Sequence, residues 1–276
     1  MNVFHGNFIR SLICAGATIF GVLAAAPAGA QSILPHRAGY ELRLESVRPG
    51  SGIVDATGVL SYDWADSCDG WTVGQRYLLD IARGEGPPLR VTAAYTNWES
   101  KDGLRYRYYV KRSRKSGAGD EREEVRGEAR LDAETHAGKA KFKKPREETL
   151  RLPEGTVFPT AHTIVLLKKA AAGEKFDRRF VFDGSELERP STISAFILPK
   201  RKAPPAGHPK VLTAPQPVWP ISLGVFSGEG AAESPEFEMT IYLQSNGVVP
   251  EMTMNYGDFT VRGKLKVFEA LKKADC

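Results

Sequence analysis

The sequence has few cysteines and lacks the histidine and cysteine spacings that indicate a metal or redox centre. Its 276 residues include three cysteines and five histidines. So few cysteines exclude a disulfide-rich scaffold, and without C-x-x-C or H-E-x-x-H motifs no thioredoxin-like or zinc-protease site is visible. The composition, 42% hydrophobic and 26% charged, is that of a globular protein and excludes disorder throughout the chain.

Long apolar runs are also absent after the N-terminus. The one candidate, residues 11–26, is shorter than the ~20 residues that a membrane-spanning helix needs. It follows Arg10, the only charged residue among the first thirty, and precedes the small-residue sequence Ala28-Gly29-Ala30. A basic start, a short apolar stretch and an A-x-A site together predict a secretory signal peptide, cleaved after Ala30, rather than a membrane anchor.

Cleavage leaves a mature domain of residues 31–276 in which Cys68 and Cys276 are the only cysteines. An oxidising export compartment favours a disulfide between them, which would attach the C-terminus to an early loop. The loop-entropy model assigns roughly 5 kcal/mol to a disulfide that closes so long a loop. Two free thiols, or a disulfide between two molecules, are the alternatives.

The mature chain shows the period-two alternation of apolar and polar residues that is typical of strands. Its hairpin turns include Asp102-Gly103 and Asn246-Gly247, where glycine accepts a positive φ. The pattern predicts an all-β, antiparallel meander, which must curl or close to cover its edges. The expected strands lie at residues 38–44, 53–64, 71–81, 91–98, 104–110, 176–182, 237–243, 248–256 and 259–268.

One amphipathic helix is predicted at about residues 159–172. Pro159 suits the first turn of a helix, and Gly173 suits its C-terminal end. Two further stretches are expected to be irregular. Residues 117–128 are mostly charged, and residues 199–220 hold seven of the eighteen prolines, which predicts a long loop within one domain rather than a central strand.

No constellation of residues predicts catalysis. A triad could be assembled on paper from Ser185, His162 and an aspartate, but Ser185 lacks the G-x-S-x-G context of a nucleophile elbow. We expect His162 to cap or pack the predicted helix. The sequence from Gly228 to Gly230 lacks the third glycine of a nucleotide-binding loop. We therefore predict no enzyme activity, no cofactor and no metal site, including at the remaining mature-chain histidines, His36, His136 and His208.

Two basic tracts, residues 105–115 and 139–146, raise the question of an anionic partner. In the first tract Arg105 and Arg107 alternate with Tyr106 and Tyr108. This alternation places cations on one face of a strand and aromatic rings on the other, as in a half-buried strand. Solvated strand faces are therefore favoured over an anionic envelope partner, and both over nucleic acid.

Several motifs together resemble the EipB-like family of periplasmic cell-envelope integrity proteins of alphaproteobacteria. The resemblance extends over the mature chain. It rests on Pro35-His36-Arg37-Ala38-x-Tyr40-x-Leu42, on Cys68 before Gly70-Trp71 together with Cys276, on Leu152-Pro153-x-Gly155-x-x-Phe158-Pro159-Thr160-x-His162-Thr163, and on Val181-Phe182-Asp183-Gly184-Ser185. It implies a β-spiral, an open barrel-like sheet around a hydrophobic cavity with one short helix, and it also implies a Cys68–Cys276 disulfide.

The favoured function is that of a non-enzymatic periplasmic protein that supports envelope integrity by binding envelope proteins or lipoproteins. A carrier of a lipid or lipoprotein is the first alternative, with an acyl chain held against inward aromatic residues such as Tyr40, Trp64 and Trp98. An envelope hydrolase using Ser185 or His162 is the second.

Overall fold

The computed structural model describes residues 33–117, 119–187, 190–201, 216–226 and 234–276. The chain divides into two units, Met1–Ala30 and Gln31–Cys276, and every described residue belongs to the second. The predicted signal peptide, His208, Gly228, Gly230 and most of the proline-rich stretch lie outside the described residues.

Within the described residues, fourteen strands form one antiparallel sheet and there is a single helix, which confirms the expected all-β class. The helix α1 spans Pro159–Ala172, as the sequence predicts. The strands are β1 His36–Val47, β2 Ile53–Asp66, β3 Gly70–Arg83, β4 Leu89–Ser100, β5 Arg105–Ser116, β6 Gly119–Leu131, β7 Gly138–Lys144, β8 Glu148–Leu152, β9 Phe176–Val181, β10 Ser191–Ile197, β11 Val218–Phe226, β12 Phe237–Gln244, β13 Glu251–Asn255 and β14 Phe259–Ala270.

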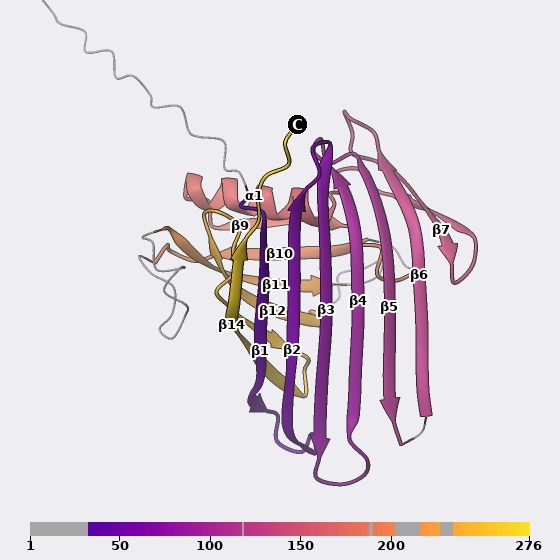
Figure 1. The fold of residues 1–276 in the computed structure, drawn as a ribbon, viewed down its shortest axis with the longest axis vertical. Coiled ribbons are helices and arrows are strands. Elements are labelled where there is room, and N and C mark those ends of the chain that lie inside the picture. The colour runs from indigo at the N-terminus through magenta and orange to yellow at the C-terminus, as the bar shows by residue number, and fades with distance from the viewer. Residues whose placement is uncertain (1–32, 118, 188–189, 202–215, 227–233) are drawn as a thin grey trace, which may run out of the picture. The chain divides into compact units, whose positions relative to one another are not determined.

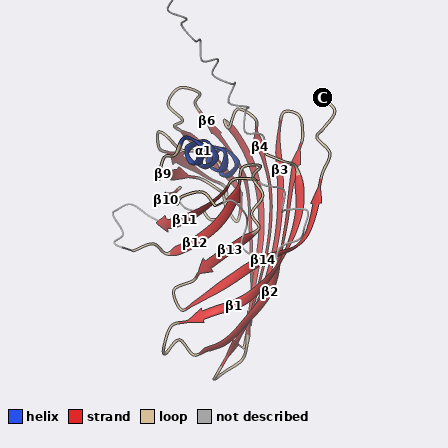
Figure 2. Ribbon diagram, turned by 90° about the vertical axis from the view of Figure 1, so that its left-hand side faces the viewer, coloured by secondary structure: helices blue, strands red, loops and turns tan. Residues whose placement is uncertain are grey.

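Nearly every strand pairs with its neighbours in the sequence. The order β8-β7-β6-β5-β4-β3-β2-β1-β14-β13-β12-β11-β10-β9 departs from a simple meander because β1 pairs with β14 and α1 separates the two edge strands. The sheet is therefore open, with edges at β8 and β9. Figures 1 and 2 show β9 to β13 folded back behind the long strands β1 to β4, so that the two wings of the sheet face each other.

The space between the wings is filled by three hydrophobic clusters. Leu42, Val261 and Leu265 lie in the cluster at the β1–β14 junction and have no exposed surface. Leu166 and Leu167 of α1 lie in a second cluster, together with side chains of β2, β3, β10, β11 and β12. A third cluster packs Tyr106 and Tyr108 of β5 against Phe158 and Phe182, which lie before and after α1 in the chain. The hydrophobic cavity that the family resemblance implies stays a prediction.

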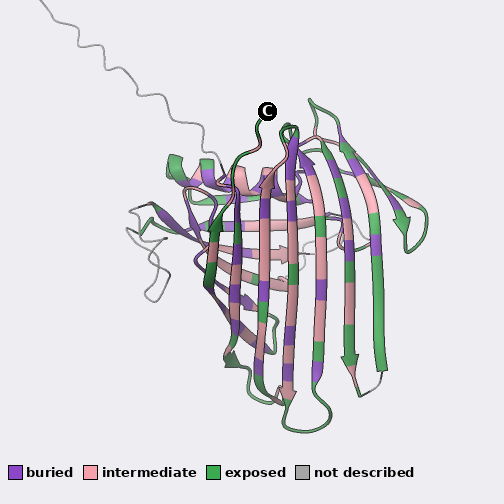
Figure 3. Ribbon diagram, in the orientation of Figure 1, coloured by how far each residue is buried: buried purple, intermediate pink, exposed green. Residues whose placement is uncertain are grey.

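The expectation of an irregular segment at residues 117–128 was wrong. This stretch begins the long strand β6, whose lower end is exposed in Figure 3. Its charges are the reason for the pairing, because Glu121 and Glu124 lie opposite Arg114 and Lys111 of β5. Opposite charges facing each other across two strands stabilise a ladder that apolar alternation alone does not predict.

The proline-rich stretch also ends in a strand rather than a loop. Residues 218–220 belong to β11, which lies between β10 and β12. Pro220 is tolerated there because β10 ends at Ile197, so little of the ladder needs the N–H that proline lacks. The carbonyl of Pro220 still accepts a hydrogen bond from the Leu198 N–H at 2.9 Å.

A buried glutamate holds the N-terminus of α1. The N-cap residue Phe158 provides no side-chain hydrogen bond, and Glu99 of β4 takes its place. The two carboxylate oxygens of Glu99 accept the N–H groups of Thr160 and Ala161, each at 2.7 Å. Only 1% of Glu99 is exposed, so burial raises its pKa to about 7 while the two N–H donors act in the opposite direction. A negative side chain at this position also complements the helix dipole.

His162 lies in the first turn of the same helix and is buried, as expected for a packing residue. Burial lowers its pKa to about 4, and the nearby Asp177 of β9 only partly opposes the shift. The Nε2 of His162 is 3.9 Å from the Oδ2 of Asp177, whose carboxylate is held by Arg179 at 2.5 Å.

The structure contains the Cys68–Cys276 disulfide, with Cα atoms 5.7 Å apart. Cys68 lies in the turn between β2 and β3 and adopts a positive φ of 63°. Cys276 ends the tail that follows β14. The bond therefore ties the end of the chain to an early hairpin 208 residues away in the sequence.

We expect Cys68→Ser or Cys276→Ser to lower the melting temperature without abolishing the fold. The loss of loop closure over 208 residues costs up to roughly 5 kcal/mol of unfolding free energy. Thermal unfolding followed by circular dichroism, with and without reductant, provides the measurement. Equal melting temperatures of the oxidised and reduced wild-type protein would contradict the prediction that this disulfide stabilises the fold.

Glu99 and His162 should make opposite contributions to the pH dependence of stability. The pKa of Glu99 rises from 4.5 to about 7 on folding, so the folded state holds a proton that the unfolded state releases, and stability falls as pH rises through this range. The pKa of His162 falls from 6.5 to about 4, so stability rises with pH between these values. The two contributions, each about 3 kcal/mol, oppose each other over most of this window.

Accordingly, in Glu99→Gln the unfolding free energy should rise more steeply with pH between pH 4.5 and 6.5. In His162→Gln it should instead fall as pH increases over the same range. Urea unfolding at a series of pH values measures both slopes, each relative to wild type. Curves of both variants that run parallel to wild type would contradict the assignment.

Candidate binding groove

Two rows of side chains cross the outer face of the sheet. One row joins Ser61, Arg76, Ala94, Lys111 and Glu124 on consecutive strands from β2 to β6. The next outward row, two residues along each strand, consists of Val59, Leu78, Thr92, Ser113 and Arg122. Between the rows lie Leu60, Tyr77 and Ala93, whose side chains point to the opposite face because successive residues of a strand alternate.

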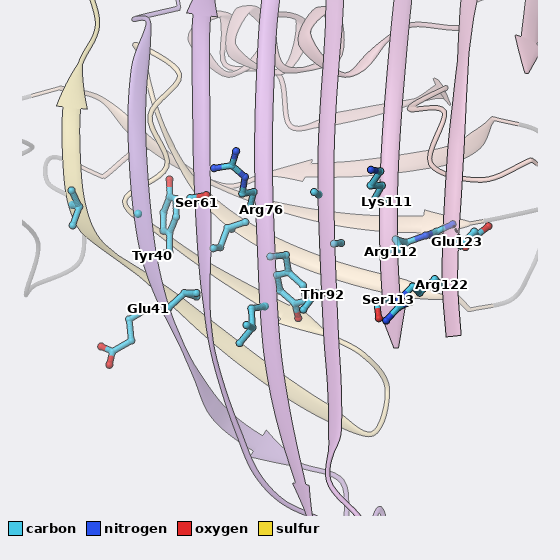
Figure 4. A pocket seen from close by; sticks show the side chains of 18 of the residues that line it. Tyr40, Glu41, Ser61, Arg76, Thr92, Lys111, Arg112, Ser113, Arg122 and Glu123 are labelled. Carbon is cyan, nitrogen blue, oxygen red and sulfur yellow. Dashed lines mark ion pairs between the residues drawn. The ribbon is translucent and has the colours of Figure 1, made fainter. Parts of the chain in front are cut away.

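These rows border a groove of about 1250 Å³ that extends over β1 to β6 and β14. Figure 4 shows its side chains on the strands, with Glu41, Arg76 and Lys111 labelled. Because the row between is turned inward, its main chain lines the groove between the two rows. Alternation along the strands therefore builds the site, without any loop.

The centre of the groove is apolar and accessible. Val59 is 57% exposed and Val267 of β14 is 63% exposed, although both are large aliphatic residues. Gly39 and Ala94, which carry little or no side chain, also line the groove. Exposed aliphatic residues that are contiguous across several strands indicate an interaction surface rather than a scatter of single residues.

Charged groups of both signs surround this centre. Glu41 and Lys266 form an ion pair at 3.2 Å, and a hydrogen bond from Arg43, followed by one from Lys266, lowers the pKa of Glu41. At the other end, Lys111 of β5 lies opposite Glu124 of β6 in the outward row. An apolar centre with a polar rim of mixed charge is the pattern of a protein–protein interface.

Among the aromatic residues predicted to point inward, two do so and one does not. Tyr40 and Trp64 are buried, and the hydroxyl of Tyr40 donates to the carbonyl of Val249 at 2.9 Å. The expectation for Trp98 was wrong. It lies on the outer face, where the guanidinium groups of Arg105 and Arg107 are 5.4 and 4.8 Å from its ring centroid. Trp98 pairs across the strands with Arg107, and the register of β4 against β5 therefore places it outside.

The first basic tract has the predicted arrangement. Arg105 and Arg107 are exposed, and Tyr106 and Tyr108 are buried in the third hydrophobic cluster. Most of the second tract, residues 139–146, belongs to strand β7, which the sequence did not predict. Its Ala140 and Phe142 are buried.

The residues of the hypothetical triad have separate partners. The backbone N–H of Ser185 donates to its neighbour Asp183, and its carbonyl accepts from Arg112 at 2.8 Å. His162 instead faces Asp177 across α1 and β9, as described above. His36 is buried and its Nδ1 is 2.7 Å from the Leu34 carbonyl, and His136 lies in the turn between β6 and β7.

Sequence reasoning missed the residues that form the groove. Val59 and Val267 occupy outward positions of strands that were expected, and their apolar character is the signal that could have identified them. Their proximity depends on the β1–β14 pairing and on the register of each hairpin, which alternation within one strand does not specify.

Within the described ranges, no helix is long and apolar enough to cross a membrane.

Comparison with known proteins gives consistent results. The family model described as EipB-like matches residues 27–272. The chain is 35% identical over 270 residues to the cell envelope integrity protein EipB of Brucella abortus (strain 2308), and the alignment covers 94% of each chain. It is also similar to the crystal structure of a beta-barrel-like protein of a domain of unknown function from Brucella abortus. That match has 31% sequence identity and a TM-score of 0.78, and it covers 87% of this chain and 99% of the other.

The assignment of outward and inward rows leads to a stability prediction. Val59→Thr should change the unfolding free energy by no more than about 0.5 kcal/mol, because the side chain is mostly in solvent. Leu60→Ala, the next residue of the same strand, should cost about 2–5 kcal/mol because it leaves a cavity in the first cluster. Urea unfolding of the two variants makes the comparison. Similar losses for both would show that the groove does not face outward.

Proposed function

The chain belongs to the EipB-like family, and on that basis we propose that it is an exported, non-enzymatic periplasmic protein that supports the integrity of the cell envelope. We further propose that it does so by binding a polypeptide segment of an envelope protein in the groove across β1 to β6. In this proposal the signal peptide is cleaved after Ala30.

The observation that carries the proposal is the composition of the groove. An acyl chain gains little from fixed charges, whereas a polypeptide segment can place apolar side chains over Val59, Leu78 and Val267 and pair its own charges with the rim. The rim has both signs, with Glu41 and Glu124 as well as Lys111 and Arg122, so it suits a partner with mixed charge rather than a uniformly charged polymer. The name of the Brucella relative, a cell envelope integrity protein, supports the envelope as the place where that partner is found.

Site-specific crosslinking in living cells tests the proposal with a matched control on the same strand. A photoreactive amino acid replaces Val59, inside the groove, or Val54, which is 58% exposed and outside it. We expect irradiation to produce a protein adduct from position 59 and none from position 54. Adducts of lipid mass would support the lipid carrier instead. Equal yields of protein adduct at both positions would contradict the proposal that the groove is the binding site. The protein recovered from the periplasm should begin at Gln31.

A complementation assay connects binding to function. Val59→Glu combined with Val267→Glu places charge at the centre of the groove, where burial against a partner makes it costly. A strain that lacks the chromosomal gene should remain sensitive to detergent with this variant and recover with Val54→Glu. Full recovery with the groove variant, at equal protein level, would contradict the proposal.

A further inference from the structure

A second exposed apolar surface lies on the opposite wing of the sheet. The outward face of the edge strand β9 and its neighbour β10 carries Phe176, Phe180, Phe196 and the adjacent Leu198, which are 47, 39, 56 and 47% exposed. Phe176 and Phe196 are paired across the two strands, with ring centroids 5.1 Å apart. We call this surface the β9–β10 face.

The fold does not need these side chains. The inward residues of β10, Ala195 and Ile197, are buried against Leu166 and Leu167 of α1, so the hydrophobic cluster under the strands is complete without the outward ones. Aromatic residues on the outside of an edge strand instead create a risk of aggregation. Their presence therefore indicates a partner.

Among the described residues, the charged side chains that point outward from β9, β10 and the residues just after β10 are all cationic. Lys175, Arg178, Lys200 and Arg201 are exposed on or beside the two strands, and none of them forms an ion pair with another described residue. The carboxylate of Asp177 points inward and is bonded to Arg179, and Glu174 pairs with Lys169 of α1. On the adjoining strands the outward acid Glu238 belongs to β12, two strands from β10, and accepts a hydrogen bond from Asn255. The β9–β10 face is thus apolar and cationic, unlike the groove with its rim of both signs.

We propose that the β9–β10 face docks onto a membrane surface that contains anionic phospholipid. Aromatic and aliphatic side chains partition into the headgroup region of a bilayer, and neighbouring Lys and Arg residues are attracted to its negative surface potential. The combination needs no pocket, only a strand face that projects from the fold. This inference does not depend on the groove or on its partner, because it concerns another wing of the sheet.

Vesicle co-sedimentation of the purified mature protein tests the proposal. The probes are vesicles of neutral phosphatidylcholine alone and vesicles with 30% phosphatidylglycerol. We expect binding to the anionic vesicles only, with an affinity that decreases as salt concentration increases. Arg178→Gln combined with Lys175→Gln should weaken it roughly thirty-fold, or about fivefold for each cation. Lys139→Gln combined with Lys143→Gln, two exposed cations of β7, provides the control for charge and should retain most of the binding.

The apolar contribution has its own matched pair. Phe176→Ser combined with Phe196→Ser should reduce binding at least tenfold, whereas Val47→Ser combined with Val54→Ser should not, although those residues are similarly exposed. All four variants alter exposed residues, and their melting temperatures are measured alongside to establish that each remains folded. An equal loss in test and control variants, or equal binding to both kinds of vesicle, would overturn the proposal.

A reporter placed in the face identifies what covers it. Phe180→Trp should gain fluorescence quenching by brominated phosphatidylglycerol beyond that of the wild-type tryptophans. Sedimentation of the protein without lipid gives the other outcome. A dimer that Phe196→Ser converts to a monomer would assign the face to a second copy of the chain and would contradict membrane docking.

Discussion

The pairing of the first strand with the last is the constraint on which the architecture depends. Every other strand pair of the described sheet joins neighbours in the sequence, but β1 and β14 must meet across more than two hundred residues. Closing such a loop has a large entropic cost. Burial of Leu42, Val261 and Leu265 at this junction offsets it, and the disulfide between the β2–β3 turn and the chain terminus acts on the same closure. Without this pair there would be two separate meanders, and the groove would lose Val267.

Once the two halves are joined, the alternation of side chains along each strand determines which residues are buried between the wings and which face outward. Inward residues fill the space between the wings, so outward positions are released from packing and can serve recognition. The long wing presents an apolar groove with charges of both signs, and the short wing presents phenylalanines among cations. Because the same sheet carries both surfaces, the two proposed binding modes, of a polypeptide and of a lipid surface, require no domain movement.

Local patterns in the sequence predicted the helix and most of the strands, while features set by distant partners were missed. Residues 159–172 have the proline and glycine signals of helix ends, and both ends were correct. Strand β6 was missed because its first half is held by charge pairing with β5, and the charges of one strand become informative only when the facing strand is known. Trp98 was predicted to point inward because it is aromatic, and this was wrong for a related reason. Residues paired across neighbouring strands share one face of the sheet, and Trp98 is paired with the exposed Arg107.

The anchoring of α1 was beyond sequence reasoning because its cap comes from another part of the chain. Phe158 precedes the helix and cannot cap it, and the carboxylate that does so belongs to β4, some sixty residues earlier. This contact has a structural consequence for the short wing. Because α1 ends at Ala172 and β9 begins at Phe176, and because Leu166 and Leu167 pack beneath β10, the position of the helix determines that of β9 and β10. The buried glutamate on the long wing therefore contributes to holding the cationic, aromatic face of the short wing in place.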